Sequence, residues 1–341
     1  MGTERCSGVN GDAMKRRNVI TVVVGLASAV SLVGALPATA AEPGADCGSY
    51  AHVAVNELTP ACSSFVEVVD VTPGRSFTVP DEGTAVTFSA VTAEGSPSVD
   101  DVTIARSDDG QVAVEVGEDG EASHQIYGTT SVLDDYATPD TSEILTVTPQ
   151  ATAPKCDSYE YSVNAYRWTG TLQWRYKTPS FGGQASVSAG FQAMANGTGA
   201  CGANKPNSAA ASYLGTTTTA SSVGSNNICG SGDYTNVVDS GSLPSGTLAA
   251  TCTYKTPNQI FAADIKISTN YSWYTGASDT GCSGSKYDLQ GIVTHEAGHA
   301  FGLNHVSQAS NQVMKPNSGT CEAGQRKLGN GDLAGMKKLY P

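Results

Sequence analysis

This 341-residue chain has little histidine, no closely spaced cysteine pair and, after its first 40 residues, no long apolar run. The cysteines never form a CxxC pair, which argues against a zinc site built from thiolates. No apolar stretch after residue 40 is long enough to span a bilayer, which argues against an internal membrane anchor. Histidine occurs only five times and is absent between residues 156 and 294, so any histidine cluster stands out.

Positive charge is also scarce in the first half of the chain. Residues 41–155 contain 20 Asp and Glu against 3 Lys and Arg, a net charge of −17. Residues 156–341 contain 10 against 12, a net charge of +2. Neither half has a basic patch able to neutralise phosphates, so nucleic acid is not an expected partner. The change in charge and the length both favour two domains.

The first 40 residues have the features of a secretory signal peptide. A basic cluster, Lys15–Arg17, precedes a mostly apolar run from Val19 to Leu36, and small residues lead up to Ala41. This order is typical of a signal that is cleaved after Ala40. We therefore expect an exported, extracellular protein with no membrane anchor after signal removal.

Eight of the nine cysteines follow residue 40. An even number in an exported chain predicts disulfide bonds. Their positions favour a Cys47–Cys62 bond by proximity. They also favour Cys282–Cys321, because these two cysteines bracket the densest group of histidines.

Residues 47–148 alternate short β-branched stretches with turns, as in DVTIARSDDGQVAVEVGEDG. This pattern is typical of an antiparallel β domain. The Asp-Asp-Gly cluster at 108–110 lacks the spaced ligands of an EF-hand loop, so a turn is a better interpretation than a calcium site. TPQATAP at 148–154 has the composition of a linker. We therefore predict an acidic, β-rich N-terminal domain over residues 41–150.

Residues 151–341 are predicted to form a domain of the α+β class, because strand and helix patterns follow one another. The Gly-, Ser-, Thr- and Asn-rich residues 201–233 are expected to be a loop, pinned by Cys201 and Cys229. Apolar spacing predicts strands at 171–178 and 261–269 and helices at 183–197 and 330–340.

Three of the five histidines fall within eleven residues, HEAGHAFGLNH. Ser285–Asp288 fits a capping box, so a helix is expected to begin there and to carry His295 and His299 one turn apart on one face. Gly302 can end this helix in the left-handed conformation, and the chain can then turn back to bring in His305. Three neutral imidazoles would leave one position of a tetrahedral zinc ion open, as in catalytic sites.

Glu296, next to His295, supplies an acid–base group. It lies about 100° around the helix from His295, so it is not placed as a fourth ligand but can reach a water molecule in the open position. Zinc lowers the pKa of such a water toward about 7, and a nearby carboxylate can take its proton. These residues together predict hydrolysis of a peptide bond.

Two other interpretations of the histidine cluster are open. Histidines can lie on the surface of a helix without binding a metal, and a structural zinc ion would normally need a fourth protein ligand. With this composition, five fixed positions match by chance in roughly one chain in 10⁵. Zinc catalysis is therefore the favoured interpretation.

The motif HExxHxxGxxH at 295–305 resembles the metzincin zinc peptidases. Within that clan, AADIKIS (262–268) and GDLAGMKKLYP (331–341) resemble the matrixins, especially secreted bacterial matrixin-like proteases. The resemblance covers residues 156–341. It implies a metzincin-like fold, with a twisted mixed sheet, an active-site helix and a C-terminal helix.

The resemblance also implies roles for individual residues. His295, His299 and His305 would bind one catalytic Zn²⁺, and Glu296 would be the general base. Met314, in NQVMKP, would form the hydrophobic base beneath the metal and would not be a ligand.

The chain departs from the matrixin pattern in three ways. The missing histidines between 156 and 294 predict that the family's second, structural zinc site is absent. The family's calcium loops cannot be matched residue by residue, so Ca²⁺ is left open as a further cofactor. A tyrosine that assists some metzincins is also missing, since Lys315–Asn317 follows Met314.

Residues 41–155 are predicted to be a removable prodomain that keeps the enzyme latent, because they lie where matrixin propeptides lie. In its Pro-basic-Cys order, APKCDS around Cys156 resembles the propeptide segment whose cysteine occupies the metal. A disulfide is the favoured role for Cys156, since withdrawing it leaves seven cysteines to pair. The N-terminal domain can also cover the active site without a thiol. A permanent accessory domain that binds cell wall or substrate is the alternative.

These observations predict a secreted zinc endopeptidase that acts on proteins or peptides through a zinc-activated water. The substrate pocket is expected in residues 306–327. One alternative is a secreted binding or adhesion protein on an inactive protease scaffold, and the intact Glu296 argues against it. Another is a zinc amidase acting on a non-peptide amide, which the motif alone does not separate from a peptidase.

Overall fold

The computed structural model describes residues 51–117, 124–134, 136, 155–164, 166–178, 182–202 and 207–341. The chain divides into two compact units, Met1–Glu42 and Pro43–Pro341, and every described residue belongs to the second. Outside the described residues lie the predicted signal peptide, Cys47 and the predicted linker at 148–154. None of the helices in the described part has the length and apolar character needed to cross a membrane.

The described elements confirm an α+β fold in which a β-rich part precedes a part that mixes strands and helices. The strands are β1 (His52–Ala54), β2 (Val68–Thr72), β3 (Arg75–Thr78), β4 (Thr84–Ala93), β5 (Asp101–Arg106), β6 (Val112–Gly117), β7 (His124–Gly128), β8 (Leu172–Tyr176), β9 (Ala211–Thr216), β10 (Val237–Gly241), β11 (Thr247–Thr256), β12 (Gln259–Ser268), β13 (Ser272–Tyr274), β14 (Lys286–Asp288) and β15 (Asn317–Ser318). The α-helices are α1 (Thr130–Asp134), α2 (Gln184–Ala195), α3 (Leu289–Phe301) and α4 (Asn330–Leu339). Short 3-10 helices lie at Val55–Glu57, Ser63–Phe65, Gln308–Ser310 and Ala323–Arg326.

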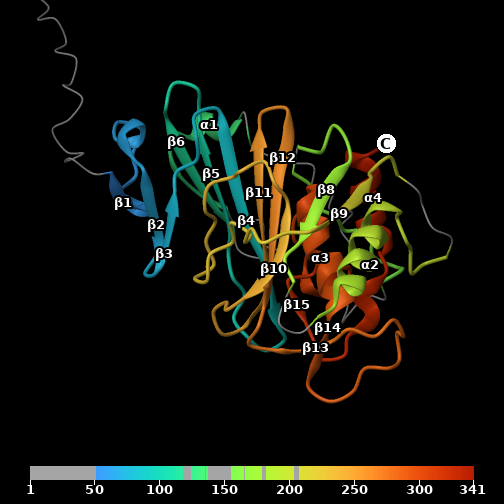
Figure 1. Cartoon of the computed structure of the whole chain (residues 1–341). Helices are drawn as coiled ribbons and strands as arrows, with labels where there is room; N and C mark the ends of the chain where they lie inside the picture. The colour runs from blue at the N-terminus through green and yellow to red at the C-terminus, as the bar shows by residue number, and fades with distance from the viewer. Residues whose placement is uncertain are drawn as a thin grey trace, which may run out of the picture. The chain divides into compact units, whose positions relative to one another are not determined.

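Most strands belong to one sheet with the order β7-β6-β5-β4-β11-β12-β10-β8-β9, and β15 also pairs with β4. The sheet is mixed, because β8, β10 and β12 run parallel whereas β11 runs antiparallel to both β12 and β4. Figure 1 shows the N-terminal strand β4 directly beside β11. The β-rich N-terminal part therefore continues the sheet of the C-terminal part.

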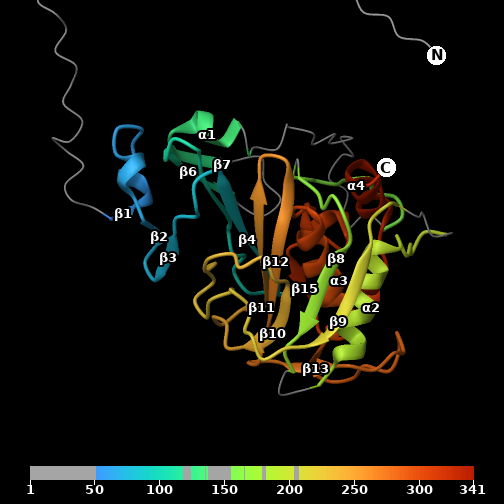
Figure 2. The ribbon, with the colours of Figure 1, turned by 45° about the horizontal axis from the view of Figure 1, so that its top comes forward.

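Two helices cover one face of the C-terminal strands. In β8 the side chains of Leu172, Trp174 and Tyr176 are buried, while those of Gln173 and Arg175 between them are exposed, which is the alternation of a strand with one covered face. Trp174 stacks on Phe191 of α2 with ring centroids 4.7 Å apart. Figures 1 and 2 show α2 and α3 on the same side of these strands.

The helices α2 and α3 approach each other closely at Gly190. A Cβ atom at this position would lie 2.9 Å from both the Thr294 nitrogen and the Val293 Cγ1 atom. Such distances are shorter than real Cβ contacts, so glycine is what allows the two helices to touch here. This contact packs α2 directly against α3, and α3 carries the first two histidines of the cluster.

Two buried clusters lie on the two sides of the sheet. The cluster on the helical side includes Trp174, Val293 and Val91, whereas the second includes Phe77 and Phe88. Since Val91 and Phe88 both belong to β4, this strand contributes to each cluster. The N-terminal and C-terminal parts therefore bury apolar surface together.

Local structure agrees with most of the sequence-based expectations. The strands expected at 171–178 and 261–269 are β8 and β12, and the helices expected at 183–197 and 330–340 are α2 and α4. The expected loop at 201–233 is wrong in part, because it contains β9. β9 is the last strand in the sheet order and none of its residues is buried, so its sequence lacks an apolar alternation.

The disulfides confirm one predicted pair and correct another expectation. Cys282 and Cys321 are bonded as predicted. Cys201 and Cys229 are not bonded to each other, so the expectation that they pin the loop between them is wrong. Cys201 bonds to Cys156, and Cys229 bonds to Cys252. Cys62 is disulfide-bonded, while its predicted partner Cys47 lies outside the described residues. Disulfides of this kind are typical of proteins folded in an oxidising compartment.

Candidate metal centre

The helix α3 begins and ends at defined capping residues. Asp288 is its N-cap, and the Asp288 carboxylate accepts a hydrogen bond of 2.8 Å from the Gly291 nitrogen. The expected start of the helix at Ser285 is wrong, because Lys286–Asp288 forms the strand β14, which pairs in parallel with β13. At the other end Gly302 adopts a φ of 102°, as expected for a left-handed C-cap. The chain then reverses toward His305.

The three histidines of the cluster meet at one point. His295 Nε2 lies 3.0 Å from His299 Nε2, and His305 Nε2 lies 3.1 Å from each of them. They are the one group among the described residues in which three or more His, Cys, Asp or Glu side chains are placed to hold a metal ion. The arrangement predicted from the spacing is therefore present.

The other ring nitrogen of each histidine faces a hydrogen-bond acceptor. His295 Nδ1 lies 2.7 Å from the Val313 carbonyl oxygen and His299 Nδ1 lies 2.9 Å from the Leu303 carbonyl oxygen. His305 Nδ1 lies 3.2 Å from Asp101 Oδ2. Since these oxygens can only accept, each Nδ1 carries a proton and each Nε2 presents a lone pair. Three converging lone pairs need a cation between them, and this donor set fits a metal ion.

Burial keeps the histidines in the form that binds metal. The exposed fractions are 0% for His295, 3% for His299 and 6% for His305. Burial, together with the neighbouring His305, lowers the pKa of both His295 and His299 well below the usual value. Neutral imidazole is the ligand form of histidine, so no proton competes for these nitrogens.

Glu296 lies beside the triad and is also completely buried. Its Oε2 accepts a hydrogen bond of 2.5 Å from the Thr251 hydroxyl, and its Oε1 accepts one of 3.3 Å from the Val91 nitrogen. Burial is the main influence and raises the pKa of Glu296 to about 8, although both hydrogen bonds act in the opposite direction. Burial in this closed arrangement therefore favours the protonated form of the carboxyl group.

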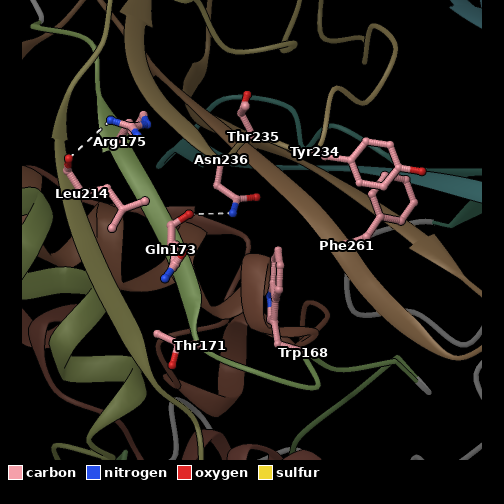
Figure 3. A pocket seen from close by; sticks show the side chains of 9 residues that line it. All are labelled: Trp168, Thr171, Gln173, Arg175, Leu214, Tyr234, Thr235, Asn236 and Phe261. Carbon is pink, nitrogen blue, oxygen red and sulfur yellow. Dashed lines mark hydrogen bonds between the residues drawn. The ribbon is translucent and has the colours of Figure 1, made fainter.

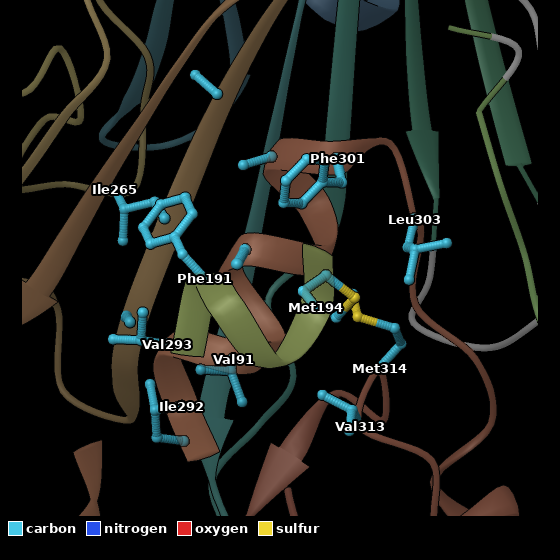
Figure 4. Close-up of a cluster of buried hydrophobic side chains, with 14 of the residues drawn as sticks. Val91, Phe191, Met194, Ile265, Ile292, Val293, Phe301, Leu303, Val313 and Met314 are labelled. Carbon is cyan, nitrogen blue, oxygen red and sulfur yellow. The ribbon is translucent and has the colours of Figure 1, made fainter. Parts of the chain in front are cut away.

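Met314 forms a packed floor under α3. It is buried, and a Cβ atom added at Gly298 would overlap its sulfur and lie 3.1 Å from Met194 Cε. Figure 4 shows the sulfur atoms of Met194 and Met314 side by side within this cluster. Asp332 fixes the turn from α4, because its carboxylate accepts hydrogen bonds from the Val313 and Met314 nitrogens at 2.8 and 3.2 Å. The packing role expected for Met314 fits these contacts.

Sequence reasoning missed four residues that touch the site or its turn. Thr251 and Asp332 come from β11 and α4, whereas Val91 and Asp101 come from the N-terminal strands β4 and β5. The contacts of Val91 and Asp101 span 205 and 204 positions along the chain. Only Asp332 carried a local signal, as an acidic residue in the first turn of a helix.

A comparison with protein families agrees with this geometry. Residues 236–341 match the model of the matrixin family. This part of the chain is a matrixin domain. No curated protein matches the chain. The matrixin domain contains α3, the complete histidine triad and Glu296, and this combination indicates a zinc metalloendopeptidase.

One matrixin-like expectation is not met. Cys156 is bonded to Cys201. Cys282 and Cys321, the cysteines that flank the triad in the sequence, are bonded to each other. The favoured role of Cys156 as a disulfide partner is therefore confirmed, and its less favoured role as a zinc-blocking thiol is wrong.

A surface pocket of about 330 Å³ lies apart from the metal centre (Figure 3). It includes Gln173 and Arg175, which point to the side of β8 opposite the buried Trp174 and α2. The pocket therefore does not belong to the site formed on α3. Its lining consists of Trp168, Thr171, Gln173, Arg175, Leu214, Tyr234, Thr235, Asn236 and Phe261.

Proposed function

We propose that this protein is a secreted, zinc-dependent endopeptidase. One observation carries the proposal: the lone pairs of three buried histidines converge within a matrixin domain. Glu296, the residue after His295 in the sequence, adds a carboxyl group that can transfer protons. His295, His299 and His305 are the proposed ligands of one catalytic Zn²⁺. A bound zinc ion supplies Lewis-acid chemistry, which polarises a carbonyl group and makes a water molecule more acidic.

Glu296 is the proposed general base. Its place next to His295 brings its carboxylate within reach of the point where the three Nε2 atoms meet. As a carboxylate it would accept a proton from the attacking water, and as a carboxylic acid it would return the proton to the leaving amine nitrogen. Thr251 would hold the carboxyl group in place during both steps through its hydroxyl hydrogen bond.

The remaining parts of the proposal concern export and processing. The predicted signal peptide, together with three disulfides in the described part of the chain, supports an extracellular enzyme. Residues 41–150 are proposed to be the prodomain of residues 151–341. The contacts of Val91 and Asp101 with the metal centre support this role, because an N-terminal domain in this place covers the site.

The function can be tested with the purified protein from culture medium. We expect it to cleave casein and members of a peptide library, and to lose this activity when a chelator removes the metal. Glu296→Ala should retain about one zinc per chain, whereas its turnover falls by about 10²–10⁴-fold because the general base is missing. Metal analysis and peptide hydrolysis rates measure the two quantities separately.

His299→Ala should lose the zinc, because two imidazoles hold the ion far less tightly than three. The matched control is His124→Ala, since His124 is an exposed histidine in β7 that belongs to no cluster of possible ligands. It should retain both zinc and activity. A Glu296→Ala variant with normal proteolysis would refute the assigned mechanism.

The two alternative functions predict other results. An adhesion protein on an inactive scaffold would bind zinc but cleave no substrate, even after its N-terminal region is removed. An amidase for non-peptide amides would be inactive on the peptide library but active on small amides, and Glu296→Ala would abolish that activity.

A further inference from the structure

The surface pocket of about 330 Å³ lies on the face of the sheet opposite α2. Gln173 and Arg175 of β8 and Phe261 of β12 contribute to it (Figure 3). β8 pairs with both β9 and β10, and β12 pairs with both β10 and β11, so the backbone groups of these strands are used within the sheet. A ligand over these strands finds no free edge to pair with, so side chains must hold it.

Tyr234 holds an aromatic ring out in the solvent beside this pocket. The residue is 74% exposed, and its ring lies against the Phe261 ring with centroids 4.7 Å apart. Its φ of 60° is in the left-handed region, which is unfavourable for a residue with a side chain. The Asp233 carboxylate stabilises this turn by accepting hydrogen bonds from the Thr235 nitrogen and hydroxyl at 2.9 and 2.6 Å. A fold that exposes a ring at a conformational cost points to a ligand that covers it.

Trp168 adds a second aromatic surface to the pocket. Its indole Nε1 donates to the Ala300 carbonyl oxygen at 2.8 Å, and its backbone nitrogen donates to the Tyr340 hydroxyl at 3.1 Å. These bonds fix the ring and use its polar atom, so the Trp168 side chain offers the pocket only an apolar surface. A proline-rich peptide, which also binds aromatic grooves, needs donors for its free carbonyl groups. Trp168 cannot supply one.

The polar side chains of the pocket are mostly neutral. Among the described residues that line it, Arg175 alone is charged, and its Nη1 atom already donates to the Leu214 carbonyl oxygen at 3.3 Å. Gln173 is exposed and carries an amide group that can both donate and accept hydrogen bonds. A single cation is too little to hold a nucleic acid by its phosphates. The lining therefore favours a neutral ligand whose polar groups both donate and accept.

A pyranose sugar combines the two features that this pocket can recognise. The C–H groups on the faces of the sugar ring are apolar and can stack on an aromatic ring, whereas the hydroxyl groups around its edge both donate and accept hydrogen bonds. A volume of about 330 Å³ is near the lower end of the range for small-molecule sites, which is about 300–1,000 Å³. The pocket therefore suits a short stretch of a sugar chain rather than a folded protein.

We propose that this pocket binds a neutral polysaccharide whose pyranose units are joined by equatorial β-1,4 bonds. Such a chain is a flat ribbon, so successive units can stack on Trp168 and on Tyr234, whereas an α-1,4-linked chain curves away. This binding goes beyond the proposed peptidase function and does not depend on it. Because α2 and α3 cover the other face of these strands (Figures 1 and 2), a bound chain leaves the metal centre free and tethers the protein to a solid polymer.

The experiment titrates the full chain with three soluble hexasaccharides by isothermal calorimetry, with zinc and after a chelator has removed it. Cellohexaose and chitohexaose are β-1,4-linked, whereas maltohexaose contains the glucose units of cellohexaose in α-1,4 linkage. We expect at least one β-linked chain to bind about tenfold more tightly than maltohexaose, a difference of about 1.4 kcal/mol, whether or not zinc is present. Absence of binding, or equal affinity for all three chains, would overturn the proposal.

Two substitutions of Tyr234 test whether the sugar binds at this pocket. Tyr234→Ala should weaken binding by about 5–30-fold, because aromatic anchors supply much of the binding energy of such sites. Tyr234→Phe keeps the stacking surface and should bind within about twofold of the wild type. Tyr159→Ala is the matched control, since Tyr159 is 47% exposed and is not among the residues that line the pocket. Wild-type affinity in Tyr234→Ala would refute the proposal.

Two other outcomes would assign the pocket to another ligand and would also refute the proposal. Raising the salt concentration to about 0.5 M should change the affinity for a neutral chain by less than about twofold. Tighter binding of polygalacturonate that is lost in salt would indicate an acidic polysaccharide. Tighter, Tyr234-dependent binding of a proline-rich peptide would indicate a peptide groove. A protein that binds a β-linked hexasaccharide but cleaves no peptide would refute the peptidase function and leave this proposal standing.

Discussion

Replacing Gly298 by alanine tests how tightly the floor of the metal centre is packed. Gly298 lies in α3 between His295 and His299, and a Cβ atom there would overlap the Met314 sulfur and lie 3.0 Å from Met314 Cε. Alanine in a helix interior is normally better than glycine by about 0.5–1 kcal/mol. Inserting a methyl group into a filled core normally costs about 1–3 kcal/mol. The second effect should win here, because Met314 is buried and Met194 blocks its retreat.

We therefore expect Gly298→Ala to lower the free energy of unfolding by about 1–2 kcal/mol. Displacement of Met314 should also move Val313, whose carbonyl oxygen accepts the hydrogen bond from His295 Nδ1. Loss of such a partner typically weakens metal binding by about 10–100-fold. Urea unfolding of the zinc-loaded protein and competition with a zinc-binding dye measure the two effects.

A double-mutant cycle tests whether the loss of stability in Gly298→Ala comes from overlap with Met314. Met314→Ala alone leaves a cavity and should cost about 2–5 kcal/mol. In the double variant the new methyl group fills part of that cavity, so the two losses should not add. Gly324→Ala is the control, because a Cβ atom there meets nothing within 4 Å. Additive losses, or a Gly298→Ala variant with unchanged stability and zinc affinity, would show that Met314 does not pack as described.

Two further predictions concern other parts of the fold. Replacing Cys282 and Cys321 together by alanine opens a bridge that spans 39 positions, and urea unfolding should show a loss of about 3–4 kcal/mol because the unfolded chain regains its freedom. A loss below about 1 kcal/mol would contradict this entropic account. Lys255 is buried over the Tyr166 ring, and burial lowers its pKa to about 8. Because the folded pKa lies below the unfolded one, the stability contributed by neutral Lys255 is lost as the pH falls through 8. Lys255→Met should therefore raise the free energy of unfolding by about 1–3 kcal/mol at pH 6.5, minus the stabilisation lost with the Tyr166 ring contact. At pH 10 the free energy of unfolding should rise only a little. An equal gain at both pH values would exclude the charge as its cause.

The sequence predicted the metal centre well where its parts lie close together in the chain. The spacing of His295 and His299, the left-handed Gly302 and the return of His305 all follow from helix geometry within eleven residues. Thr251, Val91 and Asp101 could not be predicted, because they reach the site through strand pairing over 45 to 205 positions. No local pattern encodes which strands become neighbours.

Competing local interactions explain the smaller errors. Ser285–Asp288 fits a capping box, but strand pairing with β13 extends the chain to Asp288, which then caps α3 itself. The division into two domains, which rests in part on the charge difference between the two halves, stays a prediction. The structure shows β4 and β11 in a single sheet, since strand pairing depends on backbone hydrogen bonds and buried side chains rather than on net charge.

The pairing of β4 with β11 also bears on how the protein behaves as a solute. β11 is ten residues long, and Lys255 is its only charged residue. Without β4, such a strand would present a long, flat row of unpaired backbone groups, which is a template for aggregation with other chains. While the N-terminal region is attached, β4 keeps this edge capped. An enzyme that has shed β4 would lose the cap, so self-association rather than unfolding would limit how long it survives in solution.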